Sequence, residues 1–106
     1  MIAATYQTPY YAVIFTSIRT QVDNGYEEMA QQMMELAQQQ DGFLGAESAR
    51  NSLGITVSYW KDLESIKKWK LQSDHQLAQK KGRELWYSSF KTRIARVETD
   101  YEWILP

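Results

Sequence analysis

The side chains that could carry acid–base or anion chemistry are few, and the two leading candidates lie in the second half of the chain. His75 is the single histidine, and an imidazole can act as a general base near neutral pH. Arg83 offers a guanidinium that stays charged and could stabilise a phenolate or enolate. Both residues also fit plainer roles, His75 as a solvated helix residue and Arg83 as a member of a surface ion pair. Both interpretations stay open.

Four aromatic residues are candidates for the walls of a ligand pocket: Phe15, Tyr59, Trp69 and Trp86. Trp69 falls on the apolar stripe of an expected helix, where it could pack against a flat substrate. A buried Tyr59 would need a hydrogen-bond partner for its hydroxyl and could orient a ligand. The alternative for each of the four is ordinary core packing. We predict that they bind substrate and that no cofactor or metal takes part.

That prediction about cofactors follows from the residue types that the chain lacks. There is no cysteine and only one histidine, which excludes thiolate chemistry and leaves few ligands for a transition metal. A Gly-rich phosphate loop and a nucleophile elbow are also absent from the sequence. If this is an enzyme, its chemistry must come largely from the substrate and the pocket.

Length and charge set the class of protein. The 106 residues fit one domain, with residues 1–9 as an N-terminal tail and residues 10–106 as a single domain. A net charge of −1 with scattered bases argues against nucleic acid as a partner. The start of the chain is not typical of a signal peptide, and no apolar run approaches the ~20 residues of a membrane span. We expect a cytoplasmic protein with no membrane partner.

Hydrophobic periodicity predicts the order β-α-β-β-α-β, an α+β fold of the ferredoxin-like type with a four-stranded antiparallel sheet. The expected elements are a strand at 10–19, a helix at 22–40, strands at 43–50 and 55–60, a helix at 63–70, a further helix from 73 to 87 and a last strand within 90–103.

Local signals refine these elements. Asn24 with Glu27, and Ser73 with Gln76, have the spacing of capping boxes, and Asp62 is expected to cap the helix at 63–70. The uneven alternation of apolar residues in the last strand predicts a bulge or break there.

The strands predict a sheet that is apolar on both faces. In the strand at 55–60 we expect Ile55, Val57 and Tyr59 to face the helices and Trp60 to face the other way. Helices cover only one face of a ferredoxin-like sheet. An outer face carrying aromatic and aliphatic side chains therefore predicts a homodimer that buries it.

The chain also resembles a known family. The segments that carry the resemblance are GFLGAES at 42–48, SYWKDLES at 58–65, the stretch from Trp69 to His75, and GRELWY at 82–87. They are similar to the antibiotic biosynthesis monooxygenase superfamily over roughly residues 10–103, and more closely to a poorly characterised bacterial branch of it. The resemblance implies a dimeric α/β barrel. Members oxidise aromatic polyketides or quinols without metal or flavin, degrade haem, or have no established activity.

The haem-degrading branch is disfavoured by a comparison of residues. That branch has an asparagine on the first strand, a tryptophan on the helix after the third strand, and an axial histidine ten residues later. Trp69 matches the tryptophan, but Gln79 stands at the histidine position, and the first strand has no asparagine. His75 lies between the two. A haem iron would lack its expected ligand.

The resulting hypothesis is a cofactor-independent monooxygenase of a small aromatic or quinol-like substrate. Its pocket is expected between the sheet and the helices, bounded by Phe15, Tyr59, Trp69, His75, Arg83 and Trp86. The alternative is a non-catalytic, stress-related module that uses the same cavity to bind a small hydrophobic ligand.

Overall fold

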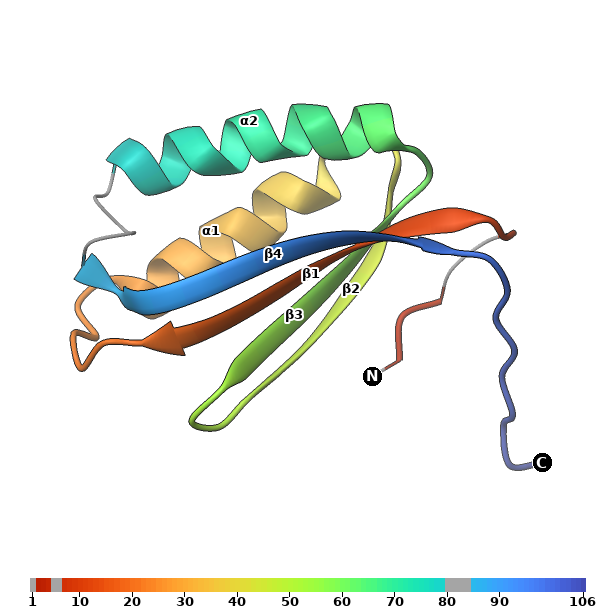
Figure 1. Ribbon diagram of the computed structural model, residues 1–106, viewed down its shortest axis with the longest axis horizontal. Helices are drawn as coiled ribbons and strands as arrows, with labels where there is room; N and C mark the ends of the chain where they lie inside the picture. The colour runs from red at the N-terminus through yellow and green to blue at the C-terminus, as the bar shows by residue number, and fades with distance from the viewer. Residues whose placement is uncertain (1, 5–6, 80–84) are drawn as a thin grey trace.

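The computed structural model describes residues 2–4, 7–79 and 85–106. Two helices lie side by side on one face of a four-stranded sheet, and both ends of the chain lie toward the other face (Figure 1). The elements are β1 (Tyr10–Arg19), α1 (Tyr26–Gln38), β2 (Phe43–Arg50), β3 (Gly54–Trp60), α2 (Leu63–Gln79) and β4 (Tyr87–Val97).

The sheet has the strand order β2-β3-β1-β4, and every neighbouring pair is antiparallel. Strands β2 and β3 form a hairpin, whereas β1 and β4 meet only because each helix crosses over the sheet. This arrangement confirms the predicted ferredoxin-like β-α-β-β-α-β fold.

The predicted capping box at the start of α1 is wrong. The helix begins at Tyr26, and Gly25 is its N-cap with φ +80° and no side-chain cap. A left-handed conformation at this position favours glycine because it has no Cβ. The carbonyl of Asn24 instead accepts a hydrogen bond of 2.9 Å from the indole Nε1 of Trp86. The entry to α1 is therefore fixed by a residue distant in sequence.

Helix α2 runs without a break, so the predicted division into two helices is wrong. Ser73, the expected cap of the second piece, lies inside the helix and donates to the carbonyl of Lys70 at 3.1 Å. An ion pair of 2.8 Å between Lys70 and Asp74 spans the same turn. Because the Ser73 hydroxyl bonds back to the preceding turn, it does not cap a new helix, and the helix continues through this position.

The predicted cap at the start of α2 is confirmed, because Asp62 Oδ1 accepts a hydrogen bond of 2.8 Å from the backbone N–H of Ser65. We expect Asp62→Ala to lower the free energy of unfolding by about 1 kcal/mol at neutral pH, the usual effect of losing such a cap. Urea denaturation of both proteins measures the difference.

The effect of Asp62→Ala should depend on pH. Hydrogen bonds from the Ser65 side chain and backbone hold the pKa of Asp62 below its usual range. A lowered folded-state pKa means that the stabilisation is present above the unfolded pKa of about 4 and is lost as pH falls through the folded value. The two proteins should therefore converge in stability once the pH falls below the folded-state pKa of Asp62. A difference that persisted in acid would contradict the capping role.

Strand β4 begins earlier and ends earlier than predicted. It runs from Tyr87 to Val97, so Tyr87 belongs to the strand and not to a helix. The register shift lies opposite Ile18 and Arg19, near the start of β4. Tyr101 and Trp103, whose spacing suggested a bulge, lie beyond the strand in an extended segment.

The core identifies which face of the sheet meets the helices. Trp60 is fully buried and packs with Ala37 of α1 and Ile66 of α2. Its ring stacks on Trp69 with centroids 5.8 Å apart, and it meets Phe43 edge-on at 5.3 Å. The expected assignment of the β3 faces is therefore inverted, since Trp60 faces the helices.

The opposite side of the sheet, called the outer face below, carries side chains that include Tyr10, Ala12, Ile14, Ile18, Ile55, Val57 and Tyr59. The chain's own ends cover one part of it. The Ala3 backbone N–H donates to Glu47 at 2.9 Å, and the Tyr10 hydroxyl donates to Asp100. Elsewhere this face is open, with Ile18 46% and Ile55 41% exposed.

Candidate functional site

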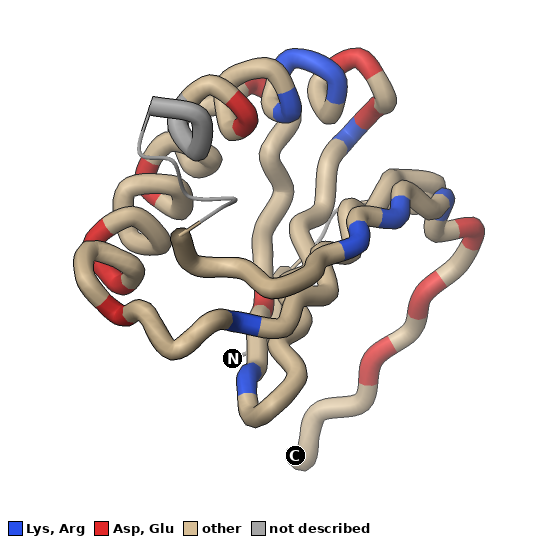
Figure 2. The backbone as a smooth tube through the Cα atoms, turned by 60° about the vertical axis from the view of Figure 1, so that its left-hand side comes forward, with Lys and Arg blue, Asp and Glu red and all other residues tan. Residues whose placement is uncertain are grey.

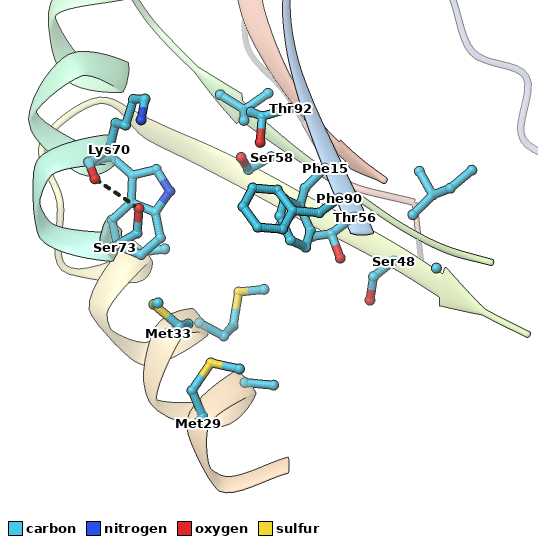
Figure 3. A pocket seen from close by; sticks show the side chains of 18 of the residues that line it. Phe15, Met29, Met33, Ser48, Thr56, Ser58, Lys70, Ser73, Phe90 and Thr92 are labelled. Carbon is cyan, nitrogen blue, oxygen red and sulfur yellow. Dashed lines mark hydrogen bonds between the residues drawn. The ribbon is translucent and has the colours of Figure 1, made fainter. Parts of the chain in front are cut away.

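A cavity of about 840 Å³ lies between the helices and the inner face of the sheet. This volume suits a drug-sized organic molecule. Figure 3 shows side chains from α1, α2 and the strands pointing toward one another across it. The core around Trp60 lies where α1 ends and α2 begins, and the cavity extends from there along the strands toward the β2–β3 hairpin.

The helix side of the pocket is mainly apolar on α1, whereas α2 also contributes the polar residues Lys70, Ser73 and Asp74. Met29, Met33 and Met34 come from α1, at the spacing that places them on one side of that helix. Trp69 reaches the pocket from α2. Methionine is flexible and polarisable, so this wall can adapt to aromatic ligands of different outline.

The sheet side combines aromatic rings with hydroxyl groups. Phe15 and Phe90 lie together with ring centroids 5.4 Å apart (Figure 3). Between and beside them the strands present four hydroxyl-bearing residues: Ser48, Thr56, Ser58 and Thr92. Hydroxyls can donate to or accept from a ligand oxygen, so this wall can orient a flat molecule that carries oxygen substituents.

A cationic group stands where the pocket meets the β2–β3 hairpin. Arg50 lines the pocket, and its guanidinium donates to the hydroxyl of Ser17 and, at 3.5 Å, to the Ser17 carbonyl. The guanidinium crosses directly over Gly54, where any added Cβ would collide with it. Glycine at that position thus makes room for the arginine.

Two phenols adjoin this cation. Tyr26 and Tyr87 both line the pocket, and their rings meet edge-on at 5.9 Å. Burial, and then a hydrogen bond to Tyr26, raise the pKa of Tyr87 well above its usual range, against the opposing charges of Arg50 and Arg19. Tyr87 is therefore a neutral phenol at physiological pH.

Arg19 supports this cluster from outside the pocket. Its guanidinium carbon lies 3.4 Å from the centroid of the Tyr26 ring, a cation–π contact. It also pairs with Asp23 at 2.9 Å. The charge of Arg19 is thus compensated, whereas no carboxylate in the described part of the chain pairs with Arg50.

Among the predicted site residues, Phe15 and Trp69 line the pocket, and their role in binding substrate stays a prediction. Trp86 is buried outside the lining, with its ring edge-on to Tyr26 at 6.1 Å, so it supports the wall from behind. Tyr59 lies on the outer face, which corrects the expectation that it borders this pocket. Burial, together with its hydrogen bond to Glu47, raises the pKa of Tyr59 to about 12.

The two predicted catalytic residues are not placed in the described pocket wall. His75 is exposed on α2, next in sequence to Asp74, which does line the pocket. Arg83 lies outside the described residues. Their assignment as base and anion-stabilising group therefore stays a prediction.

Several pocket residues were not predicted from the sequence, namely Arg50, Tyr26, Tyr87 and the four hydroxyl-bearing residues of the strands. The available signal was the alternation of Ser48 with Arg50, and of Thr56 with Ser58, along adjacent strands. Such polar alternation is typical of a solvated face. Here it lines a cavity.

Within residues 2–4, 7–79 and 85–106, no three histidine or acidic side chains are grouped closely enough to hold a metal ion. In the same part of the chain, neither helix combines the length and the apolar character needed to cross a bilayer.

Comparison with known proteins agrees with this fold. The sequence model of the family "Antibiotic biosynthesis monooxygenase" matches residues 9–81. The uncharacterised protein YqjZ of Bacillus subtilis (strain 168) is 46% identical over 99 residues, which cover 92% of this chain and 87% of YqjZ.

Solved structures extend the likeness at the level of the fold. The crystal structure of PA3566 from Pseudomonas aeruginosa superposes with a TM-score of 0.67 at 14% identity, covering 91% of this chain and 99% of that one. SnoaB, a cofactor-independent oxygenase from Streptomyces nogalater, gives a TM-score of 0.63 at 10% identity, covering 90% and 97%. With its fold, its sequence match and its close relative in agreement, the chain belongs to the antibiotic biosynthesis monooxygenase family.

Proposed function

We propose that the protein is a cofactor-independent monooxygenase that oxidises a small aromatic or quinol-like substrate in the pocket between sheet and helices. The observation that carries the proposal is the pocket itself, about 840 Å³ with methionine and aromatic walls and a row of hydroxyls. Family membership and the fold shared with SnoaB, a cofactor-independent oxygenase, support it.

The proposed reaction needs no external reductant. An activated CH₂ group flanked by aromatic rings or carbonyls loses a proton, and the resulting enolate or phenolate passes an electron to dioxygen. Recombination forms a C–O bond, and cleavage of the O–O bond leaves a carbonyl on the substrate and releases water. The four electrons that reduce dioxygen all come from the substrate carbon, so the balance closes without metal or flavin.

In this proposal the protein contributes the position of the substrate and a largely apolar surface around it. Phe15, Phe90 and Trp69 hold the ring system, and the strand hydroxyls orient its oxygen substituents. His75 and Arg83 remain the proposed base and anion-stabilising group. In His75→Ala, lost oxidation with unchanged ligand binding would support the role, and unchanged oxidation would remove His75 from the mechanism.

Oxygen uptake over a panel of quinols and anthrones tests the activity. We expect consumption above the buffer rate with at least one compound, and incorporation of one labelled oxygen atom into its product. Uptake at the buffer rate for every compound would count against a monooxygenase.

A matched pair of variants ties that activity to the cavity. Met33→Trp should narrow the pocket and lower uptake, because Met33 points into it (Figure 3). Gln31→Trp places the same bulk at an exposed position of the same helix and should leave uptake unchanged. Equal rates in the two variants would place the reaction elsewhere.

The second candidate is a non-catalytic module that binds a small hydrophobic ligand. It is favoured by the position of His75, whose exposed side chain is not part of the described pocket wall. This candidate predicts ligands that raise the unfolding temperature without any oxygen uptake. Binding or degradation of haem ranks last, and a Soret shift that disappears in His75→Ala would be needed to support it.

We also propose a cytoplasmic homodimer that forms through the outer face. The extended residues 98–106 after β4, called the C-terminal tail below, carry the acids Glu98, Asp100 and Glu102. Strand β4 presents Lys91 and Arg93 on its outer side, as their pairing with Thr16 and Ile14 indicates. Figure 2 displays these basic positions on β4 and the acidic positions of the tail. Opposite charges on two surfaces of one chain suit a second copy as the partner.

A further inference from the structure

The hairpin end of the pocket carries the positive charge of Arg50, and no acidic side chain among the described residues pairs with it. Two guanidinium nitrogens of Arg50 make hydrogen bonds, and both donate to uncharged oxygens of Ser17. Within the described chain, the ion pairs join other residues. The carboxylate in the pocket wall, Asp74, is occupied by Lys70 at 2.8 Å.

An aromatic surface lies immediately beside this charge. Ser17 pairs across the sheet with Gly54 on one side and with Phe90 on the other. The Phe90 ring therefore neighbours the site where the guanidinium is held, and Phe15 packs against Phe90. A ligand with rings on these two residues would bring its end close to Arg50.

We infer that this end of the pocket binds the anionic oxygen group of a flat aromatic ligand, with Arg50 as its counter-ion. The inference rests on the proposed function for the pocket as the ligand site, and it specifies the class of ligand: an aromatic acid or an ionised phenol. A guanidinium presents planar donors that match a carboxylate or phenolate.

The surroundings hold Arg50 ready for such a ligand. Two hydrogen bonds to Ser17 restrict the guanidinium before binding, which reduces the entropy lost when a ligand pairs with it. Tyr26 and Tyr87 line the same pocket, and their hydroxyls are further groups able to donate to a ligand oxygen.

Two fluorescent probes that differ by one anionic group test the inference. 8-Anilino-1-naphthalenesulfonate carries a sulfonate, and N-phenyl-1-naphthylamine has the same ring system without it. In Arg50→Gln we expect the Kd of the anionic probe to rise about tenfold, which corresponds to about 1.4 kcal/mol. The Kd of the neutral probe should stay within about twofold, because no ionic contact is lost.

Three further variants serve as controls. Arg50→Lys keeps the charge and should retain most of the affinity for the anionic probe. Lys67→Gln removes a cation from an exposed part of α2 outside the pocket and should change neither Kd. Gly54→Ala displaces the guanidinium and should reproduce the selectivity of Arg50→Gln. Unfolding temperatures establish that each variant is folded.

The outcomes separate this inference from the proposed function. Equal changes for both probes in Arg50→Gln, or no change for either, would overturn the anion site and leave the monooxygenase proposal standing. Loss of oxygen uptake on every compound, with the probe selectivity intact, would overturn the activity and leave the anion site. If neither probe bound the wild-type protein, the pocket would not admit a ligand of this size, and both would fall.

Discussion

Trp60→Ala is expected to lower the free energy of unfolding by about 3–5 kcal/mol, the usual range for removing a large buried aromatic side chain. Trp60 is 0% exposed and contacts both helices through Ala37 and Ile66. Its ring also stacks on Trp69. The truncation would remove the contact that joins the two helices to the sheet, and its indole N–H bond of 2.9 Å to Ser58 would be lost as well.

Such a loss is a large part of the total stability of a small domain, about 5–15 kcal/mol. Urea denaturation followed by circular dichroism measures it, and the unfolding temperature should fall by at least about 12 °C. Leu63→Ala is the control, because Leu63 is 53% exposed at the start of α2 and its loss should cost less than about 0.5 kcal/mol. Similar losses in the two variants would mean that Trp60 does not anchor the core.

The side of the sheet on which Trp60 lies could not be predicted from the sequence. The order of strands and helices could be predicted, because each has its own periodicity and the turns are signalled by residues such as Asp41, Gly42 and Asn51. The faces of β3 could not, because both sets of alternate residues include large apolar side chains. A shift of one position exchanges the two faces completely. Only the packing of Trp60 against Ile66 distinguishes them.

The helix starts were predictable only where the cap is local. Asp62 caps α2 through a residue three positions later, and the sequence contains that relation. The start of α1 depends instead on Gly25 in a left-handed conformation and on the Trp86 indole bonded to Asn24. No pattern within α1 could reveal a hydrogen-bond partner that comes from a distant part of the sequence.

The same distinction between local and distant contacts explains which residues of the candidate site could be predicted from the sequence. Phe15 and Trp69 could be predicted because aromatic residues on apolar stripes usually face the interior. Arg50 could not, because it belongs to the pocket only through its pairing opposite Gly54 and its bonds to Ser17. Ser48, Thr56 and Ser58 read as a solvated strand surface until the helices are placed above them. The sequence of a strand therefore shows that polar and apolar residues alternate, but it does not show which face of the strand lines a cavity.

The C-terminal tail carries the second large prediction, because its apolar side chains lie almost entirely in solvent. Tyr101, Trp103, Ile104 and Leu105 are 98%, 76%, 75% and 75% exposed. So many large apolar groups in a row are typical of a segment that binds another surface. The Tyr10–Asp100 hydrogen bond ties the start of the tail to the outer face. Beyond this bond, the tail extends away from the sheet on the side opposite the helices (Figure 1).

Deleting residues 98–106 is expected to raise the dissociation constant of the proposed dimer at least about a hundredfold. Burying one large apolar side chain contributes about 1.5–3 kcal/mol. A symmetric dimer has two tails, so even one buried side chain in each gives about 3 kcal/mol, or about a hundredfold in affinity. Light scattering coupled to size exclusion should give about twice the 12.4 kDa chain mass for the full chain at micromolar concentration, and a single chain mass after deletion.

Two point variants separate the tail from general surface hydrophobicity. Trp103→Ser should weaken the dimer, whereas Leu71→Ser should not, because Leu71 is 69% exposed on α2, on the side of the sheet away from the outer face. Raising the salt concentration should also weaken the dimer, because the acids of the tail would then be screened from Lys91 and Arg93. A full-length chain that is already monomeric would contradict the proposed dimer. A dimer unchanged by the deletion would mean that the strands alone form the dimer contact. The proposed role of Trp103 in the dimer would then be wrong.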